Sequence, residues 1–155
     1  MLTVRPATTS DLETIANGNA AMALETEHLH LDRETLRRGV EAVLTGHAPG
    51  HYFVAEHDSH VVGQLLLTYE WSDWRNKVVW WIQSVHVAET ARRLGVFRAL
   101  YAYVRQAARE AGAGGLRLYV DTTNARAQAV YAALGMKSGH YHVFEDMFHE
   151  PARMD

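Results

Sequence analysis

The sequence has 155 residues, the length of one domain, and its 48% hydrophobic and 21% charged residues are ordinary for a globular protein. A net charge of -3 gives no reason to expect nucleic acid or an anionic membrane as the main partner. The absence of cysteine excludes disulfides, thiolate metal sites and a cysteine nucleophile, and it fits a reducing cytoplasm. No run approaches the ~20 apolar residues of a membrane span. We therefore expect a single cytoplasmic domain over residues 1–155.

The first half of the chain predicts two helices between strands. An alternating run at Leu2–Pro6 predicts a first strand, and Asp11 and Asp32 stand where helix N-caps belong, each ahead of apolar residues at helical spacing. Two further alternating runs, His51–Glu56 and His60–Tyr69, predict a hairpin.

The second half predicts alternating strands and helices. The nearly continuous apolar run Val78–Val87 is typical of a buried central strand. After it come an amphipathic helix over Gly95–Ala111, a strand over Leu116–Val120, a helix capped by Asn124, and a last strand over His140–Phe148. The resulting order is βααβββαβαβ, which indicates one α/β domain with a mixed sheet.

The basic turn from Arg92 to Arg98 has the composition of an anion site. It follows the buried strand, contains Gly95 and opens a helix. A helix start leaves several N–H groups without intrahelical partners, and its dipole attracts negative charge. A pyrophosphate suits such a turn, while a solvated basic helix start is the alternative. The glycines and lysine of a Walker loop or a dinucleotide fingerprint are absent.

The helix between Asn124 and Gly135 carries a phenol. Tyr131 lies on its apolar stripe with Ala127 and Val130. A phenol can donate a proton to a leaving group, although packing in the core is an equally simple role for it. Asn124 can likewise act only as an N-cap.

Together these two segments resemble the GCN5-related N-acetyltransferase (GNAT) family, which moves an acetyl group from acetyl-CoA to an amine. The family pattern Arg/Gln-x-x-Gly-x-Gly/Ala is present as Arg92-x-x-Gly95-x-Phe97, in which Phe97 departs from the expected small residue. The resemblance runs from Thr3 to about Phe148. It implies a GNAT fold, with a mixed, strongly twisted sheet flanked by helices on both faces.

The resemblance also implies a cofactor site. In the family the fourth strand carries a bulge, its backbone at Val85 and Val87 pairs with the pantetheine arm, and the basic turn holds the pyrophosphate. Tyr131 would be the general acid that assists departure of the thiol. The residues assigned to acetyl-CoA are Val85, His86, Val87, Arg92, Arg93, Leu94, Gly95, Val96, Phe97, Arg98, Asn124 and Tyr131.

The proton acceptor departs from the family. Gln83 stands where many members have glutamate, and an amide does not accept a proton at neutral pH. Glu70 is the first alternative, ahead of Glu25 and Glu27, while a water chain or an amine that arrives neutral would also suffice. In a regular strand His86 points to the opposite side from Gln83, and a bulge would change that.

The acceptor side combines carboxylates with aromatic rings, which suits a cationic amine. The residues assigned to it are Glu25, Glu27, Glu70, Trp81 and Gln83. The order Thr68-Tyr-Glu-x-x-x-Trp74 is weakly similar to the polyamine branch of the family. The tryptophans can instead fill a core or a dimer interface.

We therefore predict an acetyl-CoA-dependent N-acetyltransferase, a cytoplasmic homodimer acting on a small-molecule amine, without a metal because neither of two His-x-His pairs has a third ligand grouped with it. Gln83 and Phe97 leave open an acyl-CoA-binding regulatory module without turnover. Another acyl donor and a protein amine as acceptor also stay open.

Overall fold

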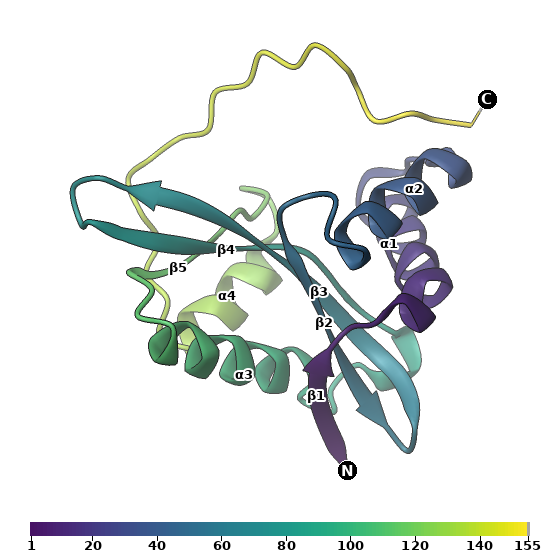
Figure 1. Ribbon diagram of the computed structural model, residues 1–155, viewed down its shortest axis with the longest axis horizontal. Helices are drawn as coiled ribbons and strands as arrows, with labels where there is room; N and C mark the ends of the chain where they lie inside the picture. The colour runs from purple at the N-terminus through teal and green to yellow at the C-terminus, as the bar shows by residue number, and fades with distance from the viewer. Residues whose placement is uncertain (155) are drawn as a thin grey trace. The chain divides into compact units, whose positions relative to one another are not determined.

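The computed structural model describes residues 1–154 and divides them into two compact units (Figure 1). The first unit holds Met1–Leu118 together with the segment that begins at Ala152, and the second holds Tyr119–Pro151. The sheet and the helices packed on it belong to the first unit.

Strands and helices follow the predicted order through the fourth helix. The first unit contains β1 (Leu2–Pro6), η1 (Thr9–Asp11), α1 (Leu12–Glu27), α2 (Arg33–Leu44), β2 (His51–His57), β3 (His60–Ser72), β4 (Lys77–Val87), η2 (Glu89–Ala91), α3 (Val96–Glu110) and β5 (Gly115–Leu118). The second unit contains α4 (Ala125–Ala133). The five strands lie in the order β1-β2-β3-β4-β5, antiparallel except for the parallel pair β4–β5. The predicted α/β fold with a mixed sheet is confirmed.

Local sequence signals explain where the elements begin and turn. Asp32 caps α2 by accepting the backbone N–H of Thr35 at 2.9 Å. The β2–β3 hairpin turns at Asp58 and Ser59, whose φ angles of 50° and 65° are those of a two-residue turn with left-handed backbone. Aspartate tolerates this region better than most residues, because its short side chain can bond the local backbone.

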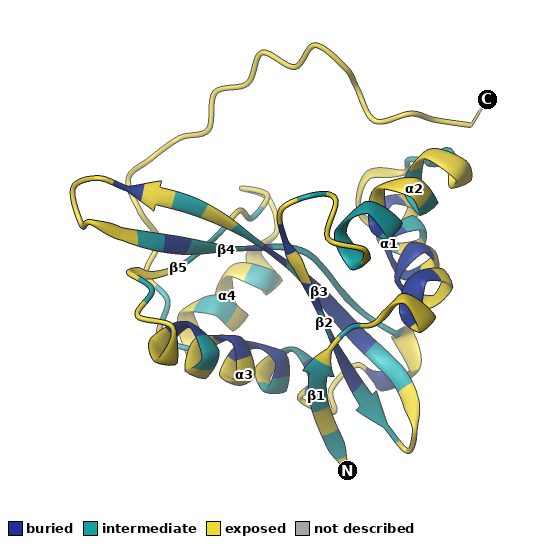
Figure 2. Cartoon of the chain, in the orientation of Figure 1, coloured by how far each residue is buried: buried dark blue, intermediate teal, exposed yellow. Residues whose placement is uncertain are grey.

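Helices cover both faces of the sheet. The Gln64 side chain donates to the backbone oxygen of Ile15 on α1, so this residue points to the α1–α2 face. Its neighbour Gly63 points to the other face, where a Cβ atom would meet Val96 and Leu100 of α3. The buried residues gather along the middle of β2 and β3 and on the helix sides that face them (Figure 2).

The buried cluster on the α1–α2 face consists of Leu12, Ile15, Ala16, Val40, Tyr52 and Val54. The buried residues of α3 are Val96, Leu100, Tyr101, Val104 and Ala108.

The strand predicted over His140–Phe148 is not observed, which corrects the end of the predicted order. These residues lie in the second unit, without helix or strand, and their side chains are exposed. The apolar pairs Val143–Phe144 and Met147–Phe148 break the two-residue alternation, so neither face of such a strand would be uniformly apolar.

Candidate functional site

The centre of the candidate site is a bulge in β4. Leu66 of β3 pairs with Gln83 and Gln64 pairs with His86, so Ser84 and Val85 together stand opposite one residue of β3. Ser84 has φ 50°, a left-handed conformation uncommon for a residue with a side chain. The extra residue interrupts the hydrogen-bonded ladder where the family resemblance predicts cofactor contacts at Val85 and Val87.

The bulge changes which face His86 points to. Gln83 and His86 pair with residues two apart on β3, and directly opposed residues of an antiparallel pair share a face. Both therefore point to the α1–α2 face. In a regular strand His86 would point away from Gln83, but β4 carries the bulge that was left open as the alternative, and its one inserted residue reverses the alternation beyond it.

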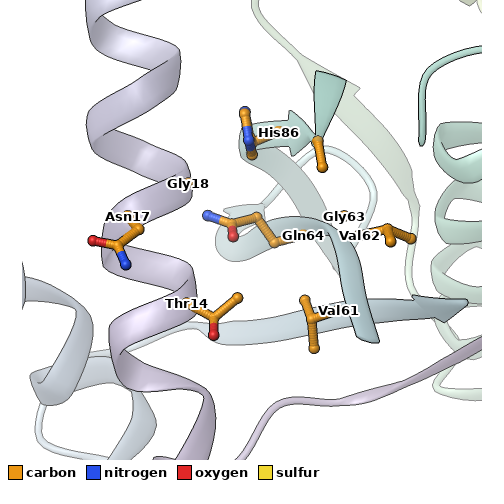
Figure 3. Close-up of a pocket in the computed structure, with 9 residues that line it drawn as sticks. Thr14, Asn17, Gly18, Val61, Val62, Gly63, Gln64 and His86 are labelled. Carbon is orange, nitrogen blue, oxygen red and sulfur yellow. The ribbon is translucent and has the colours of Figure 1, made fainter. Parts of the chain in front are cut away.

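His86 lies against α1 at the end of β4. Together with Gln64, Thr14 and Gly18 it lines a cavity of about 200 Å³ between α1, β3 and β4 (Figure 3). Burial, and after it the positive charge of Arg92, lower the pKa of the His86 imidazole below its usual value of 6.5, while Glu25 acts in the opposite direction. His86 is therefore neutral at pH 7, and one ring nitrogen can accept a proton.

The turn after β4 has the geometry of an anion cradle. Arg93 and Gly95 have φ angles of 72° and 75°, and α3 begins at Val96. A Cβ atom at Gly95 would meet no other atom within 4 Å, so a ligand can approach this backbone. The first N–H groups of α3 have no partner inside the helix. With Arg93 and Arg98 beside them, they fit a pyrophosphate.

Other residues assigned to this turn have structural positions of their own. Val96 is buried, and Leu94 is exposed. Phe97 lies one turn before Tyr101, with ring centroids 6.2 Å apart.

Arg92 binds Glu25 rather than projecting alone into solvent. Its two terminal nitrogens donate to the two carboxylate oxygens at 2.8 Å and 2.7 Å. This bond lowers the pKa of Glu25 and raises the pKa of Arg92. A residue assigned to the cofactor and one assigned to the acceptor are thus brought into direct contact. Glu27 is exposed in the same last turn of α1.

A polar row crosses the α1–α2 face of the sheet beside Gln83. Gln83 donates to the hydroxyl of Thr68, and Thr68 pairs with Trp81. Glu70, two residues further along β3, accepts a hydrogen bond from Arg117 of β5 at 2.5 Å. Arg117 and Thr68 were absent from the sequence-based assignment. Cross-strand register could have identified them, but the pattern of a single strand could not.

The second unit holds Asn124 and Tyr131 on α4. The Asn124 side chain accepts the backbone N–H of Ala127 at 3.0 Å, which makes it the N-cap of the helix. Burial raises the pKa of Tyr131 above its usual value of 10, so the phenol is protonated at neutral pH and can donate a proton.

The sequence matches the model of the acetyltransferase (GNAT) family over residues 13–136, most of the chain. The chain belongs to this family. The GNAT fold also appears in a crystal structure described as "a possible acetyltransferase from Clostridium difficile 630", with 39% identity, a TM-score of 0.88, and coverage of 97% of this chain and 99% of that one. A search of the curated proteins found no match.

Two more distant GNAT structures contain ligands. A predicted acetyltransferase with acetyl-CoA from Clostridium acetobutylicum has 14% identity and a TM-score of 0.76, covering 94% of this chain and 96% of that one. An aminoglycoside acetyltransferase from an uncultured soil metagenomic sample, in complex with sisomicin, has 18% identity and a TM-score of 0.73, with the same coverage. At this identity they show a shared fold.

In the described part of the chain, the helices are too short or too polar to cross a membrane.

The bulge geometry predicts the effect of changing Ser84. Valine is β-branched and fits φ 50° poorly, so Ser84→Val should lower the free energy of unfolding by about 1–3 kcal/mol. Glycine adopts this backbone freely, so Ser84→Gly should stay within about 1 kcal/mol of the parent protein. Urea unfolding of the three proteins measures both effects. Equal stability of the valine and glycine variants would show that residue 84 does not adopt the left-handed backbone.

Proposed function

We propose that this GNAT protein is an N-acetyltransferase that transfers the acetyl group of acetyl-CoA to a primary amine of a small cationic acceptor. The proposal depends mainly on one continuous segment of the chain, in which the β4 bulge is followed by the basic turn and then by the start of α3. This segment offers strand amides beside Val85 and Val87 and a helix N-terminus after Gly95, which match an extended pantetheine arm followed by a pyrophosphate.

The proposed reaction is direct transfer in a ternary complex. The amine nitrogen attacks the thioester carbonyl carbon, a C–N bond forms, and the C–S bond breaks. A backbone N–H near Val85 stabilises the charge that develops on the carbonyl oxygen. The phenol of Tyr131 donates its proton to the departing thiolate, and the nitrogen gives its surplus proton to a base or to water.

Glu70 is our first candidate for the base that takes the proton, and it would also help to bind the amine substrate. Arg117 donates a hydrogen bond to one of its carboxylate oxygens. His86 is a second candidate, supported by its neutral imidazole and by its shared face with Gln83. Gln83 itself would orient the acceptor or a water molecule.

The acceptor class is proposed from the charges around the site. Glu25, Glu27 and Glu70 are carboxylates, and Trp81 offers an aromatic face to a cation. The similarity to the structure with sisomicin supports a cationic amine. A small-molecule acceptor is favoured over a protein amine on this ground.

We also propose that residues 1–155 act as one GNAT domain in a cytoplasmic homodimer. The lack of cysteine suits the cytoplasm. Trp71, near the end of β3, and Trp74, in the turn between β3 and β4, are 61% and 88% exposed, and a second copy would cover them.

Free-thiol release from acetyl-CoA with a panel of amines tests the proposal, with coenzyme A binding followed by calorimetry on the same sample. Thiol release with amine-dependent turnover is the expected result. Binding without release from any amine would favour the regulatory module. Absence of binding would overturn the cofactor site.

Tyr131→Phe removes only the phenol oxygen. If Tyr131 is the acid, the variant should bind acetyl-CoA normally while kcat falls by ~10²-fold or more. Steady-state kinetics and calorimetry separate the two effects. Turnover equal to that of the parent protein would exclude Tyr131 as the acid.

A pH profile distinguishes His86 from Glu70. A base must be unprotonated, so if His86 accepts the proton, kcat/KM should fall as the pH drops through its lowered pKa, below 6.5. His86→Gln should then lower kcat and remove this acid limb. If Glu70→Gln abolishes turnover and His86→Gln leaves the profile unchanged, Glu70 is the base.

A further inference from the structure

The ion pair between Glu25 and Arg92 joins two parts of the site that are 67 residues apart in sequence. Glu25 lies in the last turn of α1, and Arg92 precedes the anion cradle of Gly95. The contact uses both terminal nitrogens of Arg92 and both oxygens of Glu25, while Nε of Arg92 donates to the backbone oxygen of Val87 at 3.4 Å. Each of the three guanidinium nitrogens of Arg92 therefore donates one hydrogen bond to the protein, which uses three of its five N–H groups.

This arrangement conflicts with both roles assigned from the sequence. A guanidinium held in a two-bond contact with a carboxylate cannot present the same two N–H groups to a pyrophosphate. Likewise, because both oxygens of Glu25 accept hydrogen bonds from Arg92, its negative charge is already balanced and attracts an ammonium group only weakly. In this state Arg92, assigned to the cofactor, and Glu25, assigned to the amine substrate, are bonded to each other instead of to a ligand.

The pair is exposed enough to be broken by a ligand. The Arg92 and Glu25 side chains are 38% and 51% exposed, and ion pairs exposed to this degree contribute little to stability because water screens them. A pyrophosphate carries more negative charge than one carboxylate and would meet the N-terminus of α3 as well as Arg92. The anion can therefore take Arg92 away from Glu25.

We propose that Arg92 exchanges Glu25 for the pyrophosphate when coenzyme A binds, and that the released Glu25 carboxylate then receives the cationic acceptor. This inference rests on the proposed acetyltransferase function. Toward the cofactor Glu25 is a positioning residue, because it acts through Arg92, whereas it contacts the acceptor directly. The exchange makes the affinities for cofactor and acceptor mutually reinforcing, since each ligand gains when the pair is already open.

Two neighbouring side chains bear on the exchange. The Glu89 carboxylate also attracts the Arg92 guanidinium, so the pyrophosphate has to compete with Glu89 as well as with Glu25. His86, which faces both members of the pair, is neutral at pH 7 and does not compete with Arg92 for the pyrophosphate.

Calorimetric titration of coenzyme A into Glu25→Gln tests the exchange. Without its competitor, Arg92 is available in advance, so the Kd for coenzyme A should fall about two- to fivefold. Glu13→Gln is the matched control, because it removes the same charge from α1 and breaks a comparable exposed pair, with Arg37. The control should leave the Kd unchanged.

A second readout follows Arg92 directly. In the parent protein, the Nε–H resonance of Arg92 should shift during the coenzyme A titration, and Glu25→Gln should shift it before any ligand is added. With an amine that supports turnover, Glu25→Gln should raise the KM for that amine about tenfold or more and change kcat less than twofold.

The outcomes separate this inference from the function on which it rests. An unchanged or higher Kd in Glu25→Gln, with normal binding by the parent protein, would overturn the exchange and leave the acetyltransferase proposal standing. Absence of coenzyme A binding by the parent protein would overturn both.

Discussion

One inserted residue in β4 determines how the site is arranged. β5 pairs with β4 only over Val79–Ile82, so beyond Ile82 the second edge of β4 has N–H and C=O groups that no strand of the described residues pairs with. Ser84, at φ 50°, takes the extra position and interrupts the ladder next to Val85. The same insertion directs His86 toward α1.

The charges of the site are organised in pairs that cross the fold. Arg92 binds Glu25 of α1, and Arg117 of β5 binds Glu70 of β3. Each pair contains at least one residue that the sequence analysis assigned to binding acetyl-CoA or the amine substrate. An acidic protein can therefore keep an anion cradle and a cation-binding face close together without leaving strong charges unmatched, at the cost of having to open a pair when a ligand arrives. In the exchange that we propose, opening the Glu25–Arg92 pair would link recognition of the cofactor to recognition of the acceptor.

Much of the fold could be predicted because its periodicities are strong. Leu2–Pro6 alternates over its whole length, and the long apolar run ending at Val87 has the composition of a central strand. The strand expected at His140–Phe148 failed because its alternation is broken twice, and pattern alone cannot show whether a partner strand exists.

The geometry of the candidate site could be predicted only where a single short segment of sequence contains all the residues that determine it. The turn at Gly95 could be recognised from the sequence because glycine and arginine stand together at a helix start. The face of His86 depends on a one-residue insertion whose presence came from the family resemblance and whose effect requires the register. The Glu25–Arg92 pair joins positions 67 residues apart, and Arg117 reaches Glu70 from a different strand, so neither contact has a local signal.

The central claim is that the β4 bulge and the start of α3 form the cofactor site. Amide NMR spectra recorded during titration with coenzyme A test it most directly. The account predicts that the largest shifts fall on the N–H groups of Val85, Val87 and the first turn of α3. Binding with the largest shifts confined to other segments, or shifts nowhere in the spectrum, would contradict it.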